Sequence, residues 1–350
     1  MDYVIFSFML VHIVSIVLAL HQLRRRRYHA PVESITIIRP MKGIDRGFLK
    51  CVSSGYKIPD DVKQIFCVSD PGDLVIRVLR NYDKQILIGD DHKFANPKLS
   101  NLEKGFITVD TKYTAFVDSN VIIPRGYLND VGACLNLPGV GMVSAPPIGV
   151  DPENGFADVE CAFLNTYQAR WQYAADALGM AFAQGKNLIF PTNIVQRLLE
   201  RLDMEPAEDA AFTKIMHSLN LRIKLLYNPP KHPVGYRSLT ELWDRQVRWA
   251  RLRRATFFWT FLPEIFMGFV PVFLSMLCSG WNALLILVYG LVWYTVEFMM
   301  AAVCNWEFNL PAVIIRDLML PFIWFAGWGS KFKWQGNERT VKSTVSRRVS

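Results

Sequence analysis

The chain has 350 residues, of which 51% are hydrophobic and 20% are charged, and its mean hydropathy of +0.16 is high for a soluble protein. This favours a soluble domain joined to a membrane portion. Because the net charge of +8 lies in blocks beside apolar segments (24–27, 245–254 and 331–348), it indicates anionic lipid at a membrane rather than nucleic acid. The six cysteines are scattered without a CxxC pair or Cys/His spacing for a metal, which fits a reducing cytosol.

The first predicted element is a transmembrane helix. Residues 2–20 are nearly all apolar and would extend about 28 Å as a helix, enough to cross a membrane. Four arginines, Arg24 to Arg27, follow this run, whereas a signal peptide carries its basic residues before it. We therefore predict an uncleaved anchor, residues 1–22, with its N-terminus outside and the following chain in the cytoplasm.

Residues 30–235 have the pattern of a soluble α/β domain. Segments with helical spacing or turn residues separate short β-branched runs, which favours a largely parallel sheet. The predicted strands are 34–40, 62–70, 84–90, 113–120 and 139–147. Asp70, Asp73 and Asp118 come at or after the ends of such runs, at the sheet edge where open α/β sheets bind ligands.

Residues 236–256 predict an amphipathic, basic helix suited to the membrane interface. Its apolar residues recur at three- and four-residue spacing: Leu239, Leu242, Trp243, Val247 and Ala250. Arg245 and Arg248 precede Trp249 on one helical face. One interpretation is snorkelling arginines with an interfacial tryptophan; the other is arginines that reach a diphosphate while the indole lines an acceptor site.

Two apolar stretches, 257–278 and 281–303, predict a tight transmembrane hairpin. The basic tail, 331–350, should be cytoplasmic, and the hairpin has already returned the chain to that side. A third apolar stretch, 310–328, should therefore be interfacial or re-entrant. We expect its Arg316–Asp317 pair to be ion-paired or to face polar surroundings.

Each acidic element allows a structural and a functional interpretation. Asp70 and Asp73 could form a turn that caps the next helix. Asp118, followed by Ser119 and Asn120, could hold a divalent cation that neutralises a diphosphate leaving group.

Glu208 and Asp209 precede an expected helix. They could simply complement the dipole of that helix. Alternatively, one of them could be the general base near an acceptor hydroxyl.

Taken in order, these elements resemble the D, D, D, (Q/R)xxRW pattern of membrane glycosyltransferases with the Rossmann-like GT-A fold. More closely, the chain resembles the ceramide glucosyltransferase family over most of residues 1–330. Besides the anchor, the resemblance rests on IIRPMKGID (37–45), CVSDPGD (67–73), NPKLSNLEKGF (96–106), FVDSNVIIP (116–124), EDAAF (208–212) and RQVRW (245–249).

The resemblance implies a role for each matching residue. Asp209 would be the catalytic base, with Glu208 beside it in the substrate site, and Asp118 would bind Mg²⁺ or Mn²⁺ and the diphosphate. The remaining substrate-binding residues would be Asp70 or Asp73 at the uridine, Lys98 by the nucleotide, and Arg245, Arg248 and Trp249 closing the donor and acceptor site. One departure is Asn120, which replaces the second acid of the usual DxD motif.

The implied activity is inverting transfer of a sugar, glucose in this family, from a UDP-sugar to a membrane lipid hydroxyl. The expected acceptor is ceramide, and the alternatives are a hopanoid or a diacylglycerol lipid. The protein would be a multi-pass membrane enzyme with its catalytic domain in the cytoplasm and no nucleic-acid partner. A different alternative, which Asn120 favours, is a non-catalytic membrane protein that retains the fold.

Overall fold

The computed structural model describes residues 2–25, 30–59, 61–82, 84–89, 97–199, 208–334 and 337–340. The chain divides into two compact units. The sheet unit comprises residues 19–150 and 171–233, and the helical unit comprises residues 1–18, 151–170 and 234–350. The predicted 30–235 domain is therefore interrupted, since residues 151–170 group with the C-terminal helices.

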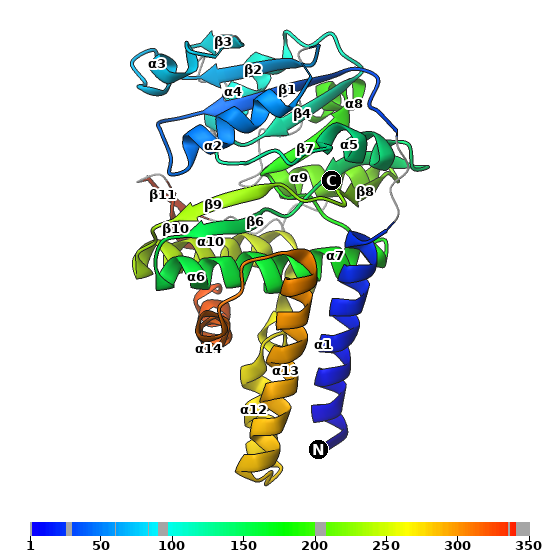
Figure 1. The fold of residues 1–350 in the computed structure, drawn as a ribbon, viewed down its shortest axis with the longest axis vertical. Helices are drawn as coiled ribbons and strands as arrows, with labels where there is room; N and C mark the ends of the chain where they lie inside the picture. Colours follow the sequence, from blue (N-terminus) through cyan, green and yellow to red (C-terminus); the bar gives the residue numbers. More distant parts are fainter. Residues whose placement is uncertain are drawn as a thin grey trace, which may run out of the picture. The chain divides into compact units, whose positions relative to one another are not determined.

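The described part of the sheet unit contains a seven-stranded sheet in the order β3-β2-β1-β4-β7-β5-β8 (Figure 1). Its strands are β1 (Ile35–Met41), β2 (Lys63–Val68), β3 (Gln85–Ile88), β4 (Tyr113–Val117), β5 (Val140–Ser144), β7 (Asn187–Pro191) and β8 (Arg222–Leu225). Neighbouring strands are parallel except around β7, which runs antiparallel to both β4 and β5. The five predicted strands and the largely parallel sheet are confirmed, whereas the sequence analysis missed β7 and β8.

Helices flank this sheet and fix the loops at its carboxyl edge. They are α2 (Phe48–Ser53), a 3₁₀ turn (Ser54–Lys57), α3 (Val75–Leu79), α4 (Pro97–Phe106), α5 (Tyr127–Leu135), α7 (Arg170–Ala177), α8 (Thr192–Leu199) and α9 (Glu208–Ser218). Helix α4 packs on β1 and β2. A Cβ at Gly105 would lie 2.6 Å from the Ile38 side chain, so glycine permits this close approach.

The helical unit contains the other helices and a β-hairpin. They are α1 (Asp2–Leu23), α6 (Gly155–Ala162), a π-helix (Phe163–Ala169), α10 (Leu239–Thr256), α11 (Phe258–Phe261), a 3₁₀ helix (Leu262–Phe266), α12 (Phe269–Cys278), α13 (Ala283–Cys304), α14 (Leu310–Ala326) and the hairpin β10 (Lys331–Trp334)–β11 (Asn337–Thr340). A separate two-stranded sheet consists of β6 (Ile148–Pro152) and β9 (Lys231–Gly235). Within each of these strands the chain passes from the sheet unit to the helical unit. Arg26, Arg27 and the tail residues 341–350 lie outside the described residues.

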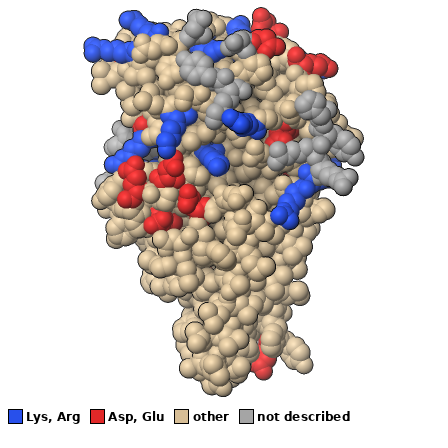
Figure 2. Space-filling model, viewed as in Figure 1, with Lys and Arg blue, Asp and Glu red and all other residues tan. Residues whose placement is uncertain are grey.

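Among the described residues, α1 and α13 are the two unbroken helices long and apolar enough to cross a membrane, each with 22 residues. On the face that Figure 2 shows, the surface over these helices has almost no charged side chains. The predicted span 257–278 is instead broken: its two helical segments are bent by 52°. Gly268 is extended at the break, and Pro263 opens the 3₁₀ helix before it. Helix α12 has ten residues and reaches only about 15 Å, half the hydrocarbon thickness.

Helix α14 occupies the third apolar stretch and continues through Pro321. Figure 1 shows it end-on, whereas α12 and α13 are seen from the side, so α14 does not run alongside them. It packs against α6, α10 and α12. The expected pairing of Arg316 with Asp317 is confirmed, with Nη2 and Oδ1 2.7 Å apart.

A larger ionic cluster surrounds that pair. It joins His12 of α1, Arg170 at the start of α7, Glu297 of α13, and Arg316 and Asp317 of α14, each at most 2% exposed. The Glu297 carboxylate lies 3.1 Å from Arg316 and 3.2 Å from Arg170, and Arg170 Nη1 lies 3.0 Å from His12 Nδ1. Two arginines balance two carboxylates in this cluster. Its ionic contacts join helices that are far apart in the sequence. We call this set the buried ionic cluster.

We expect Glu297→Gln to destabilise the protein by about 3–5 kcal/mol, because it leaves two buried arginines opposite one carboxylate. Thermal unfolding in detergent measures the effect. The matched control is Glu307→Gln, which removes the same charge from an exposed side chain. Equal unfolding temperatures for the two variants would contradict the assignment of Glu297 as the centre of the cluster.

Candidate active site

Asp118 follows β4 at the carboxyl edge of the sheet and is paired with two lysines. Its Oδ1 lies 2.7 Å from Lys98 Nζ of α4, and its Oδ2 lies 3.5 Å from Lys186 Nζ, just before β7. Lys186 also donates to the side-chain oxygen of Asn120. We call these four residues the Asp118 cluster. Lys186 was missed because a lysine before a strand carries no signal in the sequence.

The charges of this cluster favour an anion. Burial acts to raise the pKa of Asp118, but the attraction of Lys98 and Lys186 outweighs it, and the pKa is lowered. The carboxyl group is therefore ionised at neutral pH. Two lysine side chains thus converge on this carboxylate, and lysine is a common ligand of phosphate oxygens.

A buried arginine supports the loop that carries Asp118. The Arg39 side chain donates to the carbonyl oxygens of Asp118, Ser119 and Val121 at 2.9–3.2 Å, and to that of Cys51 at 2.9 Å. Burial lowers the pKa of Arg39 to about 10, so it remains charged at neutral pH. The sequence analysis gave it no role, although an arginine within an otherwise apolar strand is a signal.

Gly185 links Asp209 to the Asp118 cluster. Its N–H donates to Asp209 Oδ2 at 3.3 Å, and its carbonyl accepts from Lys98 Nζ at 2.9 Å. Asp209 Oδ1 also accepts from the N–H of Ala210 at the start of α9, as the helix-dipole interpretation expects. The structure thus brings Asp209, Lys98 and Asp118 together, whereas the Glu208 side chain lies outside the described residues.

Asp70 and Asp73 both support turns. Asp73 accepts from the N–H groups of Gly43 and Val75 at 2.8 and 2.9 Å, which occupies both carboxylate oxygens. Asp70 accepts from the N–H of Gly72 through one oxygen at 2.8 Å, and its side chain is exposed. Of the two, Asp70 is therefore the more accessible to a ligand.

A divalent cation fits this edge only together with a bound diphosphate. Asp118 and Asn120 offer hard oxygen ligands, and His232 lies against the same loop, with Nδ1 2.9 Å from the Asn120 carbonyl oxygen. The described residues hold no group of three or more His, Cys, Asp or Glu side chains able to bind a metal. The phosphate oxygens would have to complete the coordination.

The remaining predicted residues belong to the helical unit. A capping box between Ser238 and Glu241 begins α10. Helix α10 packs against α6 and α14 and buries Leu242, Val247 and Ala250, whereas Leu239 is exposed. Arg245 pairs with Glu160 of α6 at 2.7 Å, a partner that the sequence analysis missed.

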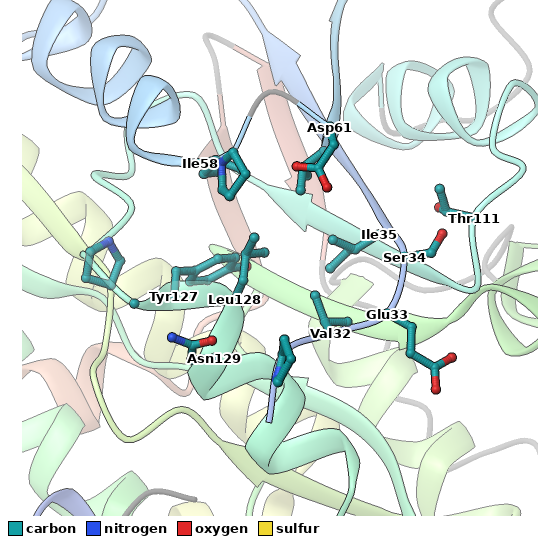
Figure 3. A pocket seen from close by; sticks show the side chains of 15 residues that line it. Val32, Glu33, Ser34, Ile35, Ile58, Asp61, Thr111, Tyr127, Leu128 and Asn129 are labelled. Atoms are coloured by element: carbon teal, nitrogen blue, oxygen red, sulfur yellow. The ribbon is translucent and has the colours of Figure 1, made fainter. Parts of the chain in front are cut away.

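A cavity of about 450 Å³ lies at the opposite, amino edge of the sheet (Figure 3). Ser34 and Ile35 at the start of β1, Val62 just before β2, and Tyr127 and Asn129 of α5 line part of it. None of the predicted site residues lines this cavity. It therefore gives no support to the predicted chemistry.

Comparison with known proteins gives a match over nearly the whole chain. The model of "Glycosyl transferase family 21" matches residues 4–346. The chain is 21% identical to ceramide glucosyltransferase 1 of Caenorhabditis elegans over 96% of this chain and 79% of that protein. It is 34% identical to a ceramide glucosyltransferase of Candida albicans, but over 30% of this chain and only 23% of that protein.

Among solved structures, a mannosyltransferase from Pyrobaculum calidifontis in complex with GDP-Man and Mn²⁺ is similar. It shares 15% identity at a TM-score of 0.47, over 93% of this chain and 97% of that one. A TM-score this low supports no conclusion about ligands.

The pairing of Asp118 with Lys98 should make stability depend on pH. Because the pKa of Asp118 in the folded state lies below its ordinary value of 3.8, the pairing stabilises the fold above that pH, and the contribution is lost as the pH falls through the folded pKa. Lys98→Met should therefore cost about 1–2 kcal/mol near neutral pH and little in acid.

Thermal unfolding between about pH 3 and pH 7 tests this dependence. Lys112→Met is the matched control, because Lys112 pairs with the exposed Glu33. A stability difference between wild type and Lys98→Met that does not change with pH would contradict the assignment.

Proposed function

The chain belongs to glycosyl transferase family 21, and we propose that it transfers glucose from UDP-glucose to the hydroxyl group of ceramide. Family membership confirms the resemblance read from the sequence, and the seven-stranded sheet with its helices confirms the expected α/β class. Within the family, the observation that carries the proposal is the pair of lysines that converges on Asp118 at the carboxyl edge, linked through Gly185 to Asp209. It supports both an anionic donor and a nearby base.

In the proposed donor complex, Lys98 and Lys186 bind the diphosphate of the UDP-sugar. Their release from Asp118 frees that carboxylate for Mg²⁺ or Mn²⁺, which Asp118 and Asn120 would hold. The cation, when bound, neutralises charge on the leaving diphosphate. Asp70 is the proposed contact for uridine, because it is exposed and has one oxygen not used by the turn.

The proposed reaction is a single displacement. Asp209 removes the proton from the ceramide hydroxyl as that oxygen attacks the anomeric carbon, and the bond between this carbon and the diphosphate oxygen breaks. UDP leaves with both bonding electrons, and Lys98 and Lys186 stabilise its charge. The configuration at the anomeric carbon inverts. From the resemblance to the family's RxxRW motif, we also assign Arg248 to binding of the diphosphate and Trp249 to the acceptor site.

We expect the purified wild type to release UDP from UDP-glucose when ceramide is supplied with Mg²⁺ or Mn²⁺. Asp209→Asn should lower turnover about 100-fold or more, since the amide cannot accept the proton but can still accept the Gly185 hydrogen bond. UDP binding should change little. Coupled UDP detection, mass spectrometry of the lipid and calorimetry with UDP measure these quantities.

The control for this variant is Asp110→Asn, at an exposed aspartate of the same unit. If the wild type glycosylates a hopanoid or diacylglycerol but not ceramide, the acceptor is wrong and the reaction class stands. If no lipid in the panel leads to UDP release, the non-catalytic alternative that Asn120 favours replaces the proposal. Turnover of Asp209→Asn within a few-fold of wild type would exclude Asp209 as the base.

The proposed topology has the N-terminus outside, the α12–α13 turn outside and the catalytic residues in the cytoplasm. It rests on the basic residues after α1 and on reading α11–α12 as a broken span. Cys278 is exposed at the end of α12, beside that turn. Labelling of this native cysteine therefore reports on which side of the membrane the turn lies.

A membrane-impermeant maleimide should label Cys278 in intact cells, because the proposed topology places it outside. Mass spectrometry of the purified protein identifies the labelled residue, and Cys278→Ser provides the control. Labelling only after permeabilisation would make α11–α12 re-entrant and reverse the direction of α13.

A further inference from the structure

Glu160 of α6 is a carboxylate placed where an uncompensated charge would be costly. The residue is 0% exposed, and neither carboxylate oxygen accepts a well-aligned hydrogen bond from the described residues. Its ion-pair partner there is Arg245, with Nη1 2.7 Å from Oε1. Because a buried charge strongly destabilises a protein unless it is paired, this contact fixes the arginine as much as the carboxylate.

Arg245 connects Glu160 to Trp249. The guanidinium carbon lies 4.7 Å from the centre of the indole ring, within the range of a cation–π interaction. Arg245 and Trp249 are four residues apart on α10 and therefore share a face. Carboxylate, guanidinium and indole form one continuous set of contacts.

Helix α6, which carries Glu160, also packs against the indole of Trp249. Trp249 packs against a cluster that includes Ala157 and Cys161, four residues apart on α6, and Leu164 of the π-helix that follows. Helix α6 therefore fixes Arg245 by charge and Trp249 by packing. Elements from the middle and from the end of the sequence meet here within one unit.

The two arginines of the motif consequently differ. The positive charge of Arg245 is balanced by Glu160, whereas Arg248 is half-buried and makes no hydrogen bond or ion pair with the described residues. Arg248 thus keeps its positive charge for an anion. The sequence had given both arginines the same role.

We propose that Glu160 is a positioning residue for sugar transfer. It holds Arg245, and through it Trp249, in the conformation that turnover requires, while Arg248 remains the arginine for the anionic donor. This inference rests on the proposed function, since it assigns a supporting residue to the RxxRW motif. It predicts that Glu160 acts on activity only through Arg245.

Three variants test this dependence: Glu160→Gln, Arg245→Met and the double variant E160Q/R245M. We expect each single variant to lower kcat about 100-fold with a smaller change in KM for UDP-glucose, because misplacement of a positioned group mainly affects turnover. The double variant should lose no more activity than Arg245→Met alone. Glu153→Gln, an exposed carboxylate of the same unit, is the matched control and should keep wild-type kcat.

The double variant also separates folding from positioning. Removal of one partner leaves a buried charge and can unfold the protein, whereas removal of both is close to neutral for stability. A folded double variant with low kcat supports the proposal, and one with wild-type kcat overturns it. Losses from the two single variants that multiply in the double also overturn it. A wild type that transfers no sugar would instead defeat the proposed function.

Discussion

A buried guanidinium, that of Arg39, is the constraint on which the candidate site depends. Arginine cannot lose its proton at neutral pH, so its charge must be satisfied inside the sheet unit. Backbone carbonyls of the loop after β4 satisfy it, and they include those of Asp118 and Ser119. The loop therefore cannot move without leaving hydrogen-bond donors of a buried cation unpaired. Asp118 is held where Lys98 and Lys186 can reach it.

Charge balance separates structural clusters from the candidate site. In the buried ionic cluster, two arginines face two carboxylates, and Glu160 with Arg245 forms a second balanced pair. The Asp118 cluster instead places two lysines around one carboxylate and a neutral amide, and Arg248 has no counter-charge bonded to it among the described residues. Basic side chains at partly accessible positions suit an anionic ligand. A balanced buried pair needs no ligand.

The break in the apolar stretch before α12 depends on the buried ionic cluster. Where a helix is interrupted at membrane depth, freed backbone groups need partners from the protein. The N–H of Phe269, directly after Gly268, donates to Asp317 Oδ2 at 3.3 Å, and Tyr294 of α13 donates to the same oxygen at 3.3 Å. Asp317 thus has two partners besides Arg316. Asp317, a charged residue in an apolar stretch, thus accepts a hydrogen bond from the backbone directly after the break.

The sequence by itself determined the two long apolar helices, the first five strands and the family, because hydrophobic period and motif order are local features, but it did not show the break in the stretch 257–278. It marked Asp118, Asp209 and the RxxRW motif as candidates but could not separate their structural from their functional interpretations. Only the tertiary structure decided that Glu160 pairs with Arg245, that Lys186 joins Lys98 at Asp118, and that Glu297 faces Arg316. These partners lie 19 or more residues apart and on different elements, and only folding brings them together. Such contacts have no period in the sequence, since they follow from which helix packs on which.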